Sequence, residues 1–565
     1  MHSNTSRRTF VKGLAAGGLL GGLGLWRTPV WAVTSPGEPQ VLAGTDFDLL
    51  IGETPINITG TSRTAMTING GIPGPLLRWR EGDTVTLRVK NKLNADTSIH
   101  WHGILLPANM DGVPGLSFHG IEPDGMYVYQ FKVRQNGTYW YHSHSGFQEQ
   151  SGVYGPLVID AKEPEPFQYD RDYVVMLTDW TDEDPVSLMK TLKKQSDYYN
   201  YNKPTVGDFI HDVSEKGWGS TVADRKMWAE MKMNPTDLAD VSGATYTYLM
   251  NGQAPNANWT GVFRPGEKLR LRFINGSGMT YFDVRIPGLK MTVVAADGLH
   301  VKPVNVDEFR IAVAETYDVI VEPTEAAYTL FAQSMDRTGF ACGTLAAKAG
   351  LSAPVPPLDP RPLVTMDDMG MGGMDHGSMA GMDHSAMAMP GMQSHPETEK
   401  DNPLVDMQAM TTTPKLDDPG LGLRNNGRRV LTYSDLRSTF EDPDGREPSR
   451  TIELHLTGHM EKFAWSFNGV KFSDAEPVRL KYGERVRVVL LNDTMMTHPI
   501  HLHGMWSDLE DENGEFMVRK HTIDMPPGSR RSYRVTADAL GRWAYHCHLL
   551  YHMEMGMFRE VRVEE

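Results

Sequence analysis

The chain has 565 residues, with 55 Lys and Arg against 71 Asp and Glu, so its formal net charge is −16. This length exceeds that of one ordinary domain and predicts two to four domains. The acidic balance argues against nucleic acid and anionic membranes as partners.

Residues 1–32 are predicted to be an export signal. Residues 6–12 contain the twin arginines Arg7 and Arg8, residues 13–25 are rich in Gly and Leu, and Ala32 is a small exit residue. The apolar run is too short to span a bilayer comfortably. We therefore expect a periplasmic mature protein that is exported by the twin-arginine route and has no stable membrane insertion.

A strand-like pattern occurs three times, in residues 82–91, 266–275 and 483–492. Each copy starts with Gly and an acidic residue, ends in Asn and is preceded by an Asn-Gly pair. The alternation of apolar and polar residues is typical of a half-buried strand after a turn. We predict an all-β chain of three tandem Greek-key β-sandwich domains, at 40–165, 166–350 and 421–565, with a Met/His-rich flexible linker at 351–420.

The second domain contains an insertion at about 185–240. Leu188 and Leu192 are four residues apart, as are Met227 and Met231, which predicts short amphipathic helices. We interpret the insertion as a packed surface excursion, because Met at helical spacing usually fills a core. A lid over a metal site is the alternative.

Residues 366–395 are rich in Met and His, and the Met-Asp-His pattern of 374–376 recurs at 382–384. No hydrophobic period appears in this stretch, so a mobile linker is expected. Thioethers are soft ligands that favour Cu(I). We therefore predict that additional copper is captured there, by Met374, His376, Met379, Met382, His384 and Met387. A linker without a bound metal is the alternative.

Four short motifs, at 100–103, 142–144, 498–504 and 546–557, hold ten of the 20 histidines. On an extended strand, residues two apart project to the same face, so each His-x-His pair offers two imidazoles to one side. Cys547 lies between His546 and His548, and Met557 follows. A thiolate with two imidazoles and a long axial thioether is the ligand set of a blue, electron-transferring copper. A chance cluster or a zinc half-site is the alternative.

Only the first and third repeats carry these histidines. We align the middle copy at residues 315–318, which contain no His pair. The shared metal cluster should therefore lie between the first and third domains, with the second domain as a spacer. Neither domain alone would complete such a site.

The four motifs resemble, in order and spacing, those of the multicopper oxidases, whose domains are cupredoxin-like. The resemblance implies four copper ions: one type-1, one type-2 and two type-3. It implies type-1 ligands His498, Cys547, His552 and Met557, type-2 ligands His100 and His501, and type-3 ligands His102, His142, His144, His503, His546 and His548. Electrons are expected to enter through an exposed edge of His498 or His552 and to leave through Cys547 toward the other coppers.

Two acids are candidates for proton transfer. Asp111 lies nine residues after His102, where the family places an acid near the type-2 copper; a solvated turn acid is the alternative, because Asp111-Gly112 is a turn signal. Related Cu(I) oxidases have an acid directly after the second type-1 His. Here Met553 takes that place and Glu554 follows it.

Asp493, Met495 and Met496, just before His498, resemble a Cu(I) substrate site, with ordinary packing as the alternative. The twin-arginine signal, the Met-Asp-His repeats and the His-Cys-His-Leu-Leu-Tyr-His ending resemble the copper-resistance protein A branch of bacterial multicopper oxidases. This resemblance implies a periplasmic copper-resistance oxidase that converts Cu(I) to Cu(II) while dioxygen is reduced to water. We expect a monomer with other periplasmic copper-handling proteins as candidate partners. The alternatives are a laccase-like oxidase of phenolic or other organic donors and a copper-sequestering protein.

Overall fold

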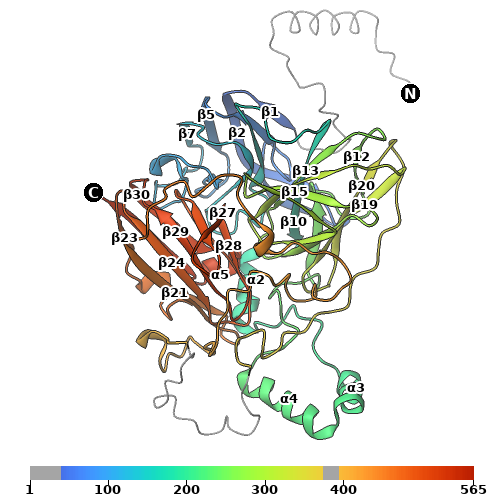
Figure 1. Cartoon of the computed structure of the whole chain (residues 1–565). Coiled ribbons are helices and arrows are strands. Elements are labelled where there is room, and N and C mark those ends of the chain that lie inside the picture. Colours follow the sequence, from blue (N-terminus) through green and yellow to red (C-terminus); the bar gives the residue numbers. More distant parts are fainter. Residues whose placement is uncertain (1–39, 373–392) are drawn as a thin grey trace, which may run out of the picture.

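The computed structural model describes residues 40–372 and 393–565. The predicted export signal and the predicted copper-capture residues Met374, His376, Met379, Met382, His384 and Met387 lie outside the described residues. In the described part of the chain, six β-sheets form three β-sandwiches in sequence order (Figure 1). The predicted all-β architecture is confirmed. None of the described helices is long and apolar enough to cross a membrane.

The first sandwich pairs a five-stranded sheet, in the order β1-β4-β9-β8-β6, with the four-stranded sheet β3-β2-β5-β7. Its elements are β1 (Val41–Ala43), β2 (Asp46–Asn57), β3 (Ser62–Ile68), β4 (Leu76–Arg80), β5 (Thr84–Asn91), β6 (His100–His102), the 3-10 helix η1 (Ala108–Met110), β7 (Met126–Lys132), β8 (Gly137–His142) and β9 (Tyr154–Asp160). All of them lie within the first proposed domain.

The second sandwich combines the sheets β11-β10-β13-β18-β15-β16 and β12-β20-β19-β14-β17. Its strands are β10 (Arg171–Thr181), β11 (Tyr246–Met250), β12 (Trp259–Val262), β13 (Leu269–Asn275), β14 (Phe282–Arg285), β15 (Met291–Ala296), β16 (Leu299–Val306), β17 (Glu308–Ile311), β18 (Thr316–Val321), β19 (Ala327–Ser334) and β20 (Phe340–Ala346).

The third sandwich combines the sheets β22-β21-β24-β29-β26-β27 and β23-β31-β30-β25-β28. Its elements are β21 (Arg450–His459), β22 (Ala464–Phe467), η4 (Phe472–Asp474), β23 (Val478–Lys481), β24 (Arg485–Asn492), β25 (His498–Leu502), β26 (Ser507–Glu510), β27 (Phe516–Lys520), β28 (Thr522–Met525), β29 (Arg530–Thr536), β30 (Gly541–Cys547), α5 (Leu550–Glu554) and β31 (Phe558–Glu564). Between β20 and β21 the described part of the chain forms only the 3-10 turns η2 (Glu397–Glu399) and η3 (Tyr433–Asp435).

The three sequence repeats occupy the same place in each sandwich. They form β5, β13 and β24, and each of these strands pairs in parallel with β2, β10 or β21. The terminal residues Asn91, Asn275 and Asn492 each donate two side-chain hydrogen bonds, of 2.7 to 3.1 Å, to backbone carbonyls of the following segments. This Asn therefore fixes the turn after the central strand in every copy, which explains why the repeat ends on it.

The alignment of residues 315–318 with the histidine-bearing strands is wrong. These residues lead into β18, which pairs with β13 and β15. The strand that corresponds to β8 and β30 in sheet order is β19, which carries no histidine. A four-residue pattern does not reveal which of the two sheets a strand joins, because that choice depends on long-range pairing.

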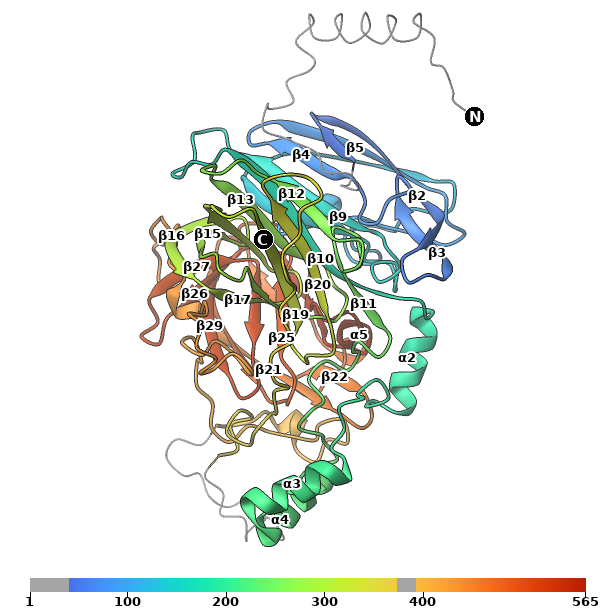
Figure 2. The same cartoon turned by 90° about the vertical axis from the view of Figure 1, so that its right-hand side faces the viewer.

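The expected helices of the insertion are α2 (Pro185–Lys194), α3 (Val206–Lys216) and α4 (Trp218–Met231). α2 begins with Pro185 after Asp184, whose carboxylate accepts a hydrogen bond from the backbone N–H of Ser187 at 2.9 Å. It buries Leu188 and Leu192. α3 and α4 pack against each other and project from the sandwiches (Figures 1 and 2).

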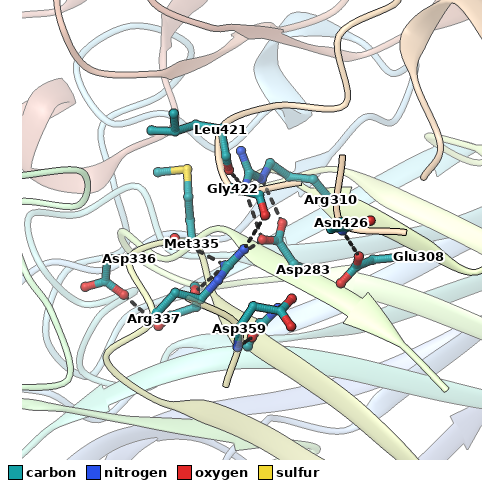
Figure 3. A network of polar contacts seen from close by, with 12 residues as sticks. Asp283, Glu308, Arg310, Met335, Asp336, Arg337, Asp359, Leu421, Gly422 and Asn426 are labelled. Carbon is teal, nitrogen blue, oxygen red and sulfur yellow. Dashed lines mark hydrogen bonds and ion pairs between the residues drawn. The ribbon is translucent and has the colours of Figure 1, made fainter. Parts of the chain in front are cut away.

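Buried ion pairs tie the segment before the third sandwich to the second one (Figure 3). The carboxylate of Asp283 accepts from Arg310 at 2.7 Å and from Arg337 at 2.6 Å. Arg310 also donates to the carbonyl of Leu421 at 2.7 Å. The buried carboxylate of Asp283 fixes the positions of Arg310 and Arg337. Because both guanidinium groups also donate to backbone carbonyls, of Leu421 and Gly422, they fix the segment before the third sandwich against the second.

Candidate metal centre

The histidine motifs lie on two equivalent pairs of strands, β6 with β8 and β25 with β30. In register, His100 is opposite His142 and His501 is opposite His546. The first and third sandwiches lie against each other (Figures 1 and 2), so the two pairs of strands meet. His-x-His spacing on a strand points both imidazoles to one face, and here that face is the boundary between the domains.

A thiolate cluster lies inside the third sandwich. The Sγ of Cys547 is 3.5 Å from the Nδ1 of His498 and 3.9 Å from the Nδ1 of His552, and the two Nδ1 atoms are 3.1 Å apart. Met557 is buried beside them and exchanges backbone hydrogen bonds of 3.1 Å with Cys547 and His552. The donor atoms of His498, Cys547 and His552 therefore face one point.

Both histidines of the thiolate cluster are covered on their outer sides. The Nε2 of His498 contacts the hydroxyl of Thr494 at 2.8 Å. The Nε2–H of His552 donates to the carboxylate of Asp240 at 2.7 Å, and Trp465 stacks on the same ring at 3.9 Å between centroids. His498 and His552 are fully buried, so the expected exposed entry edge is wrong. Asp240 at the end of the insertion covers the edge that sequence reasoning expected to be open.

A second, larger cluster lies between the first and third sandwiches. It contains the eight remaining histidines of the four motifs, His100, His102, His142, His144, His501, His503, His546 and His548, and the donor atoms of overlapping groups of three lie within 4.8 Å of one another. The Nε2 atoms of His503 and His546 face each other at 3.1 Å. Six buried ring nitrogens have no hydrogen-bond partner: Nδ1 of His102 and Nε2 of His100, His142, His144, His501 and His548.

The opposite ring nitrogens of several of these histidines are held in place. Nδ1–H of His100 donates to the carbonyl of Asp111 at 2.8 Å, and Nδ1–H of His501 donates to the carbonyl of His521 at 2.6 Å. Nδ1–H of His546 donates to the carbonyl of Cys547 at 2.9 Å. Such contacts fix the tautomer and leave Nε2 with a free lone pair for a metal.

Electrostatics agree with metal binding. Burial, with the neighbouring imidazoles, lowers the pKa of His102, His144, His501 and His503 well below the ordinary value. Neutral imidazole is the form that ligates metal. Orphaned, neutral nitrogens that converge on one buried space are otherwise rare in native proteins. The residues therefore fit copper at both clusters.

Two acids lie beside the larger cluster. The Oδ2 of Asp111 accepts from Nδ1–H of His503 at 2.9 Å, and its Oδ1 is buried without a hydrogen-bond partner. The Oε2 of Glu149, which the sequence did not single out, contacts Nδ1 of His142 at 2.6 Å. Glu554 is exposed on α5. Burial raises the pKa of Glu149 well above its ordinary value.

An additional histidine touches the larger cluster. The Nδ1 of His521 is 3.2 Å from the Nε2 of His102, and the ring is buried. His521 lies between β27 and β28 and belongs to no His-x-His pair, so no spacing signal reveals it. Asp240 and Glu149 also lie outside the four histidine motifs, so the sequence gives no signal for them.

The predicted substrate residues near the thiolate cluster are buried. Met495 and Met496 are both 1% exposed and belong to the core. Asp493 is also buried, and its Oδ2 is 2.7 Å from Nδ1 of His455. Asp493 of the predicted substrate site therefore contacts His455, a histidine outside the four motifs.

Three regions of the chain, residues 51–164, 171–349 and 445–565, match family models that are each described as multicopper oxidase. With the thiolate cluster and the histidine cluster, these matches define the class: the chain belongs to the multicopper oxidases. It is accordingly a copper-dependent oxidase with copper cofactors, and the predicted family is confirmed.

Over its whole length the chain is similar to proteins named copper resistance protein A. It is 79% identical to a copper resistance protein A homolog of Pseudomonas syringae pv. tomato, with 100% of both chains covered. It is 74% identical to copper resistance protein A of Escherichia coli, with 99% of both covered. The predicted branch of the family is therefore confirmed, and the chain is a copper-resistance multicopper oxidase.

Solved structures share the fold at lower identity. Fet3p, a multicopper oxidase that functions in iron import, has a TM-score of 0.65 at 20% identity, with 93% of this chain and 91% of that chain covered. The laccase from Botrytis aclada has a TM-score of 0.61 at 21% identity, with 93% and 88% covered. These likenesses concern the fold alone.

Proposed function

We propose that this protein oxidises Cu(I) to Cu(II) in the periplasm, after twin-arginine export, and reduces dioxygen to water. Oxidation of four Cu(I) ions releases four electrons, and one dioxygen takes up these electrons and four protons to give two water molecules. The observation that carries the proposal is the covered thiolate cluster: Asp240 and Thr494 contact the outer edges of His552 and His498. A bulky organic donor finds no open ligand edge there, whereas a carboxylate suits a metal ion.

The ligand sets support four copper ions. His498, Cys547, His552 and Met557 would hold a type-1 copper, His100 and His501 a type-2 copper, and His102, His142, His144, His503, His546 and His548 two type-3 coppers. When bound, copper supplies one-electron transfer from the donor to dioxygen. Cys547 lies directly between His546 and His548, so one residue of chain joins the thiolate cluster to the larger cluster.

Protons reach the larger cluster through carboxyl groups of this chain. Asp111 accepts from Nδ1–H of His503 and presents a second oxygen, Oδ1, that has no hydrogen-bond partner and lies 3.4 Å from Nδ1 of His100. Burial raises the pKa of Glu149 well above its ordinary value, which favours the protonated form of this carboxyl beside His142. Glu554, the other acid that the sequence predicts for proton transfer, is the alternative to Glu149.

A laccase-like oxidation of organic donors is the second candidate. A cavity lined by Met495, Thr497, Tyr433 and Asp524, among others, lies next to the segment that leads to His498. It offers an aromatic ring and a carboxylate to a small donor. Copper sequestration, the third predicted function, concerns residues 366–395 and is tested by their deletion.

Dioxygen uptake by the copper-loaded protein tests the proposal. Uptake with Cu(I) that is lost in Cys547→Ser and is weak with a phenol supports cuprous oxidation. Turnover of the phenol without uptake from Cu(I) contradicts it in favour of the laccase-like activity. Absence of uptake with either donor, with copper retention that depends on residues 366–395, favours sequestration.

A further inference from the structure

Four metal-ligating side chains gather at a third place, apart from both clusters described above. His395 and Glu399 lie just before and at the end of η2, His455 is on β21, and Asp493 directly follows β24. β21 and β24 are parallel neighbours with Leu456 opposite Asn492, so the fold brings His455 and Asp493 together. His395 and Glu399 are one helical turn apart and close the other side.

The donor atoms have the spacing of a coordination shell. Nδ1 of His395 is 3.3 Å from Oε2 of Glu399 and 3.3 Å from Oδ2 of Asp493. Nδ1 of His455 is 2.7 Å from Oδ2 of Asp493 and 3.6 Å from Oε1 of Glu399. Ligands at about 2.0 Å from a metal are roughly 2.8 to 4.0 Å from one another in a square-planar shell and roughly 3.3 Å in a tetrahedral one. The four side chains thus surround a single point.

Each of the four side chains also makes a polar contact on its outer side, away from the shared point. Nε2–H of His395 donates to the carbonyl of Ala409 at 3.1 Å, and the N–H of Ala409 donates to Oδ1 of Asp493 at 2.8 Å. The amide of Gln408 donates to Oε2 of Glu399 at 3.0 Å. Nε2 of His455 faces Oε1 of Glu453 at 3.4 Å. Outer contacts of this kind orient metal ligands and select their tautomer.

Two of the inward atoms have no hydrogen-bond partner. Oε1 of Glu399 and Nδ1 of His395 are buried without one, and the Glu399 residue is only 3% exposed. Both atoms have ion-pair contacts of 3.3 to 3.6 Å, but these contacts supply no hydrogen bond, and a buried polar atom without one is costly in a protein interior. A cation at the shared point would satisfy both.

We propose that His395, Glu399, His455 and Asp493 form a binding site for a divalent transition-metal ion, with Cu(II) as its preferred occupant. Two imidazole nitrogens and two carboxylate oxygens suit Cu(II), which binds N/O sites more tightly than the other divalent first-row ions. Cu(I) prefers soft sulfur ligands. Asp493 therefore belongs to a hard site, in place of the soft substrate site that the sequence suggested.

The position of the site suggests where its ion comes from, and this step alone rests on the proposed function. Asp493 precedes Thr494, whose hydroxyl contacts His498 of the thiolate cluster. The site is therefore placed to receive the Cu(II) that oxidation of Cu(I) produces near that cluster. Binding the product at imidazole and carboxylate groups would keep it away from soft ligands.

Equilibrium dialysis of the copper-loaded full chain against buffered Cu(II), followed by metal analysis, tests the site. The background is His376→Gln/His384→Gln, which removes the other histidines of the Met-rich tract. We expect the background protein to bind one more Cu(II) than the same protein with Glu399→Gln/His455→Gln. In that variant, Cu(II) binding at the site should be at least about 100-fold weaker. The matched control is His300→Gln, because His300 also faces a glutamate, Glu165, at 3.3 Å, and that carboxylate is already paired with Arg270 at 2.7 Å.

The blue absorption of the type-1 copper reports whether each variant is folded, and Glu399→Gln and Asp493→Asn singly serve if the double variant is not. Equal Cu(II) content and affinity in the background and its site variants would overturn the proposal, as would the absence of an additional Cu(II) in the background protein. The electron paramagnetic resonance spectrum of the additional Cu(II) should show two imidazole nitrogens. If the additional Cu(II) is present but Cu(I) supports no dioxygen uptake, the site stands and the proposed function fails.

Discussion

The Nε2–H of His552 donates to the carboxylate of Asp240 at 2.7 Å across 312 residues of chain. One partner ends the helical insertion of the second domain, and the other is a ligand in the thiolate cluster of the third. Burial raises the pKa of Asp240 to about 7. The insertion therefore places a titrating group on the outer side of the thiolate cluster.

The reduction potential of the type-1 copper should depend on this carboxyl. Above pH 7 the anion strengthens the hydrogen bond and makes His552 more electron-rich, which favours the oxidised metal. Asp240→Asn should remove this effect, so its potential at pH 8.5 should exceed that of the wild type by about 60 mV, one tenfold step of a one-electron couple. The reduction potentials of the wild type and Asp240→Asn should converge at pH 5.5. Redox titration of the blue absorption measures the difference, and Glu215→Gln, an exposed acid of α3, is the control; equal potentials at pH 8.5 would contradict the prediction.

Replacement of Asp111 should slow the reduction of dioxygen without disturbing the thiolate cluster. Asp111→Asn keeps the shape of the side chain but cannot exchange a proton beside His503. We expect kcat to fall about 100-fold while the blue absorption stays unchanged. Steady-state dioxygen uptake measures this effect, with the exposed Asp96→Asn as the matched control. A normal rate would show that Asp111 only positions His503.

Glu149 and Glu554 should differ sharply when each is changed to Gln. Glu149 is buried against His142, whereas Glu554 is exposed. We expect Glu149→Gln to lower kcat about 10- to 100-fold and Glu554→Gln to change it less than about twofold. Uptake rates measured from pH 5 to 8 distinguish the two. The reverse order would restore the role that the sequence predicts for Glu554.

Stability should depend on pH through Asp406. Its Oδ2 accepts from the backbone N–H of Met460 at 2.6 Å, and burial raises its pKa to about 7. The folded state therefore retains a proton that the unfolded chain releases near pH 4, so the wild type loses stability as pH rises from 4 to 7. The loss relative to Asp406→Asn should reach at most about 4 kcal/mol. Melting temperatures of both proteins across this range give the comparison, and parallel curves would rule out the contribution.

Loss of the buried carboxylate of Asp283 should strongly destabilise the protein. Asp283→Asn leaves the guanidinium groups of Arg310 and Arg337 buried without a counter-charge. The expected loss is about 3 to 5 kcal/mol, against less than about 1 kcal/mol for Glu322→Gln in the exposed pair with Lys268. Urea unfolding of the copper-loaded proteins provides the measurement. Similar midpoints for the two variants would contradict the expectation.

The sequence by itself determined the features that depend on local geometry. Period-two spacing sends both imidazoles of each His-x-His motif to one side of a strand, and the alternating repeat that ends in Asn marks the central strand of each sandwich. These patterns were sufficient for the three-domain fold and for the residues that converge in the two clusters. They need no knowledge of how the domains dock.

The tertiary structure alone decided which residues from other segments meet these ligands. Asp240, Glu149 and His521 carry no spacing signal, and the four-residue spacing of His395 and Glu399 does not reveal His455 and Asp493 as their neighbours. Each of these residues reaches its partner through domain docking or loop placement. The sequence alignment of residues 315–318 failed for the same reason, since strand order in a sheet is set by long-range pairing. Contacts such as His503 with Asp111 span 392 residues, and only packing of the first sandwich on the third creates them.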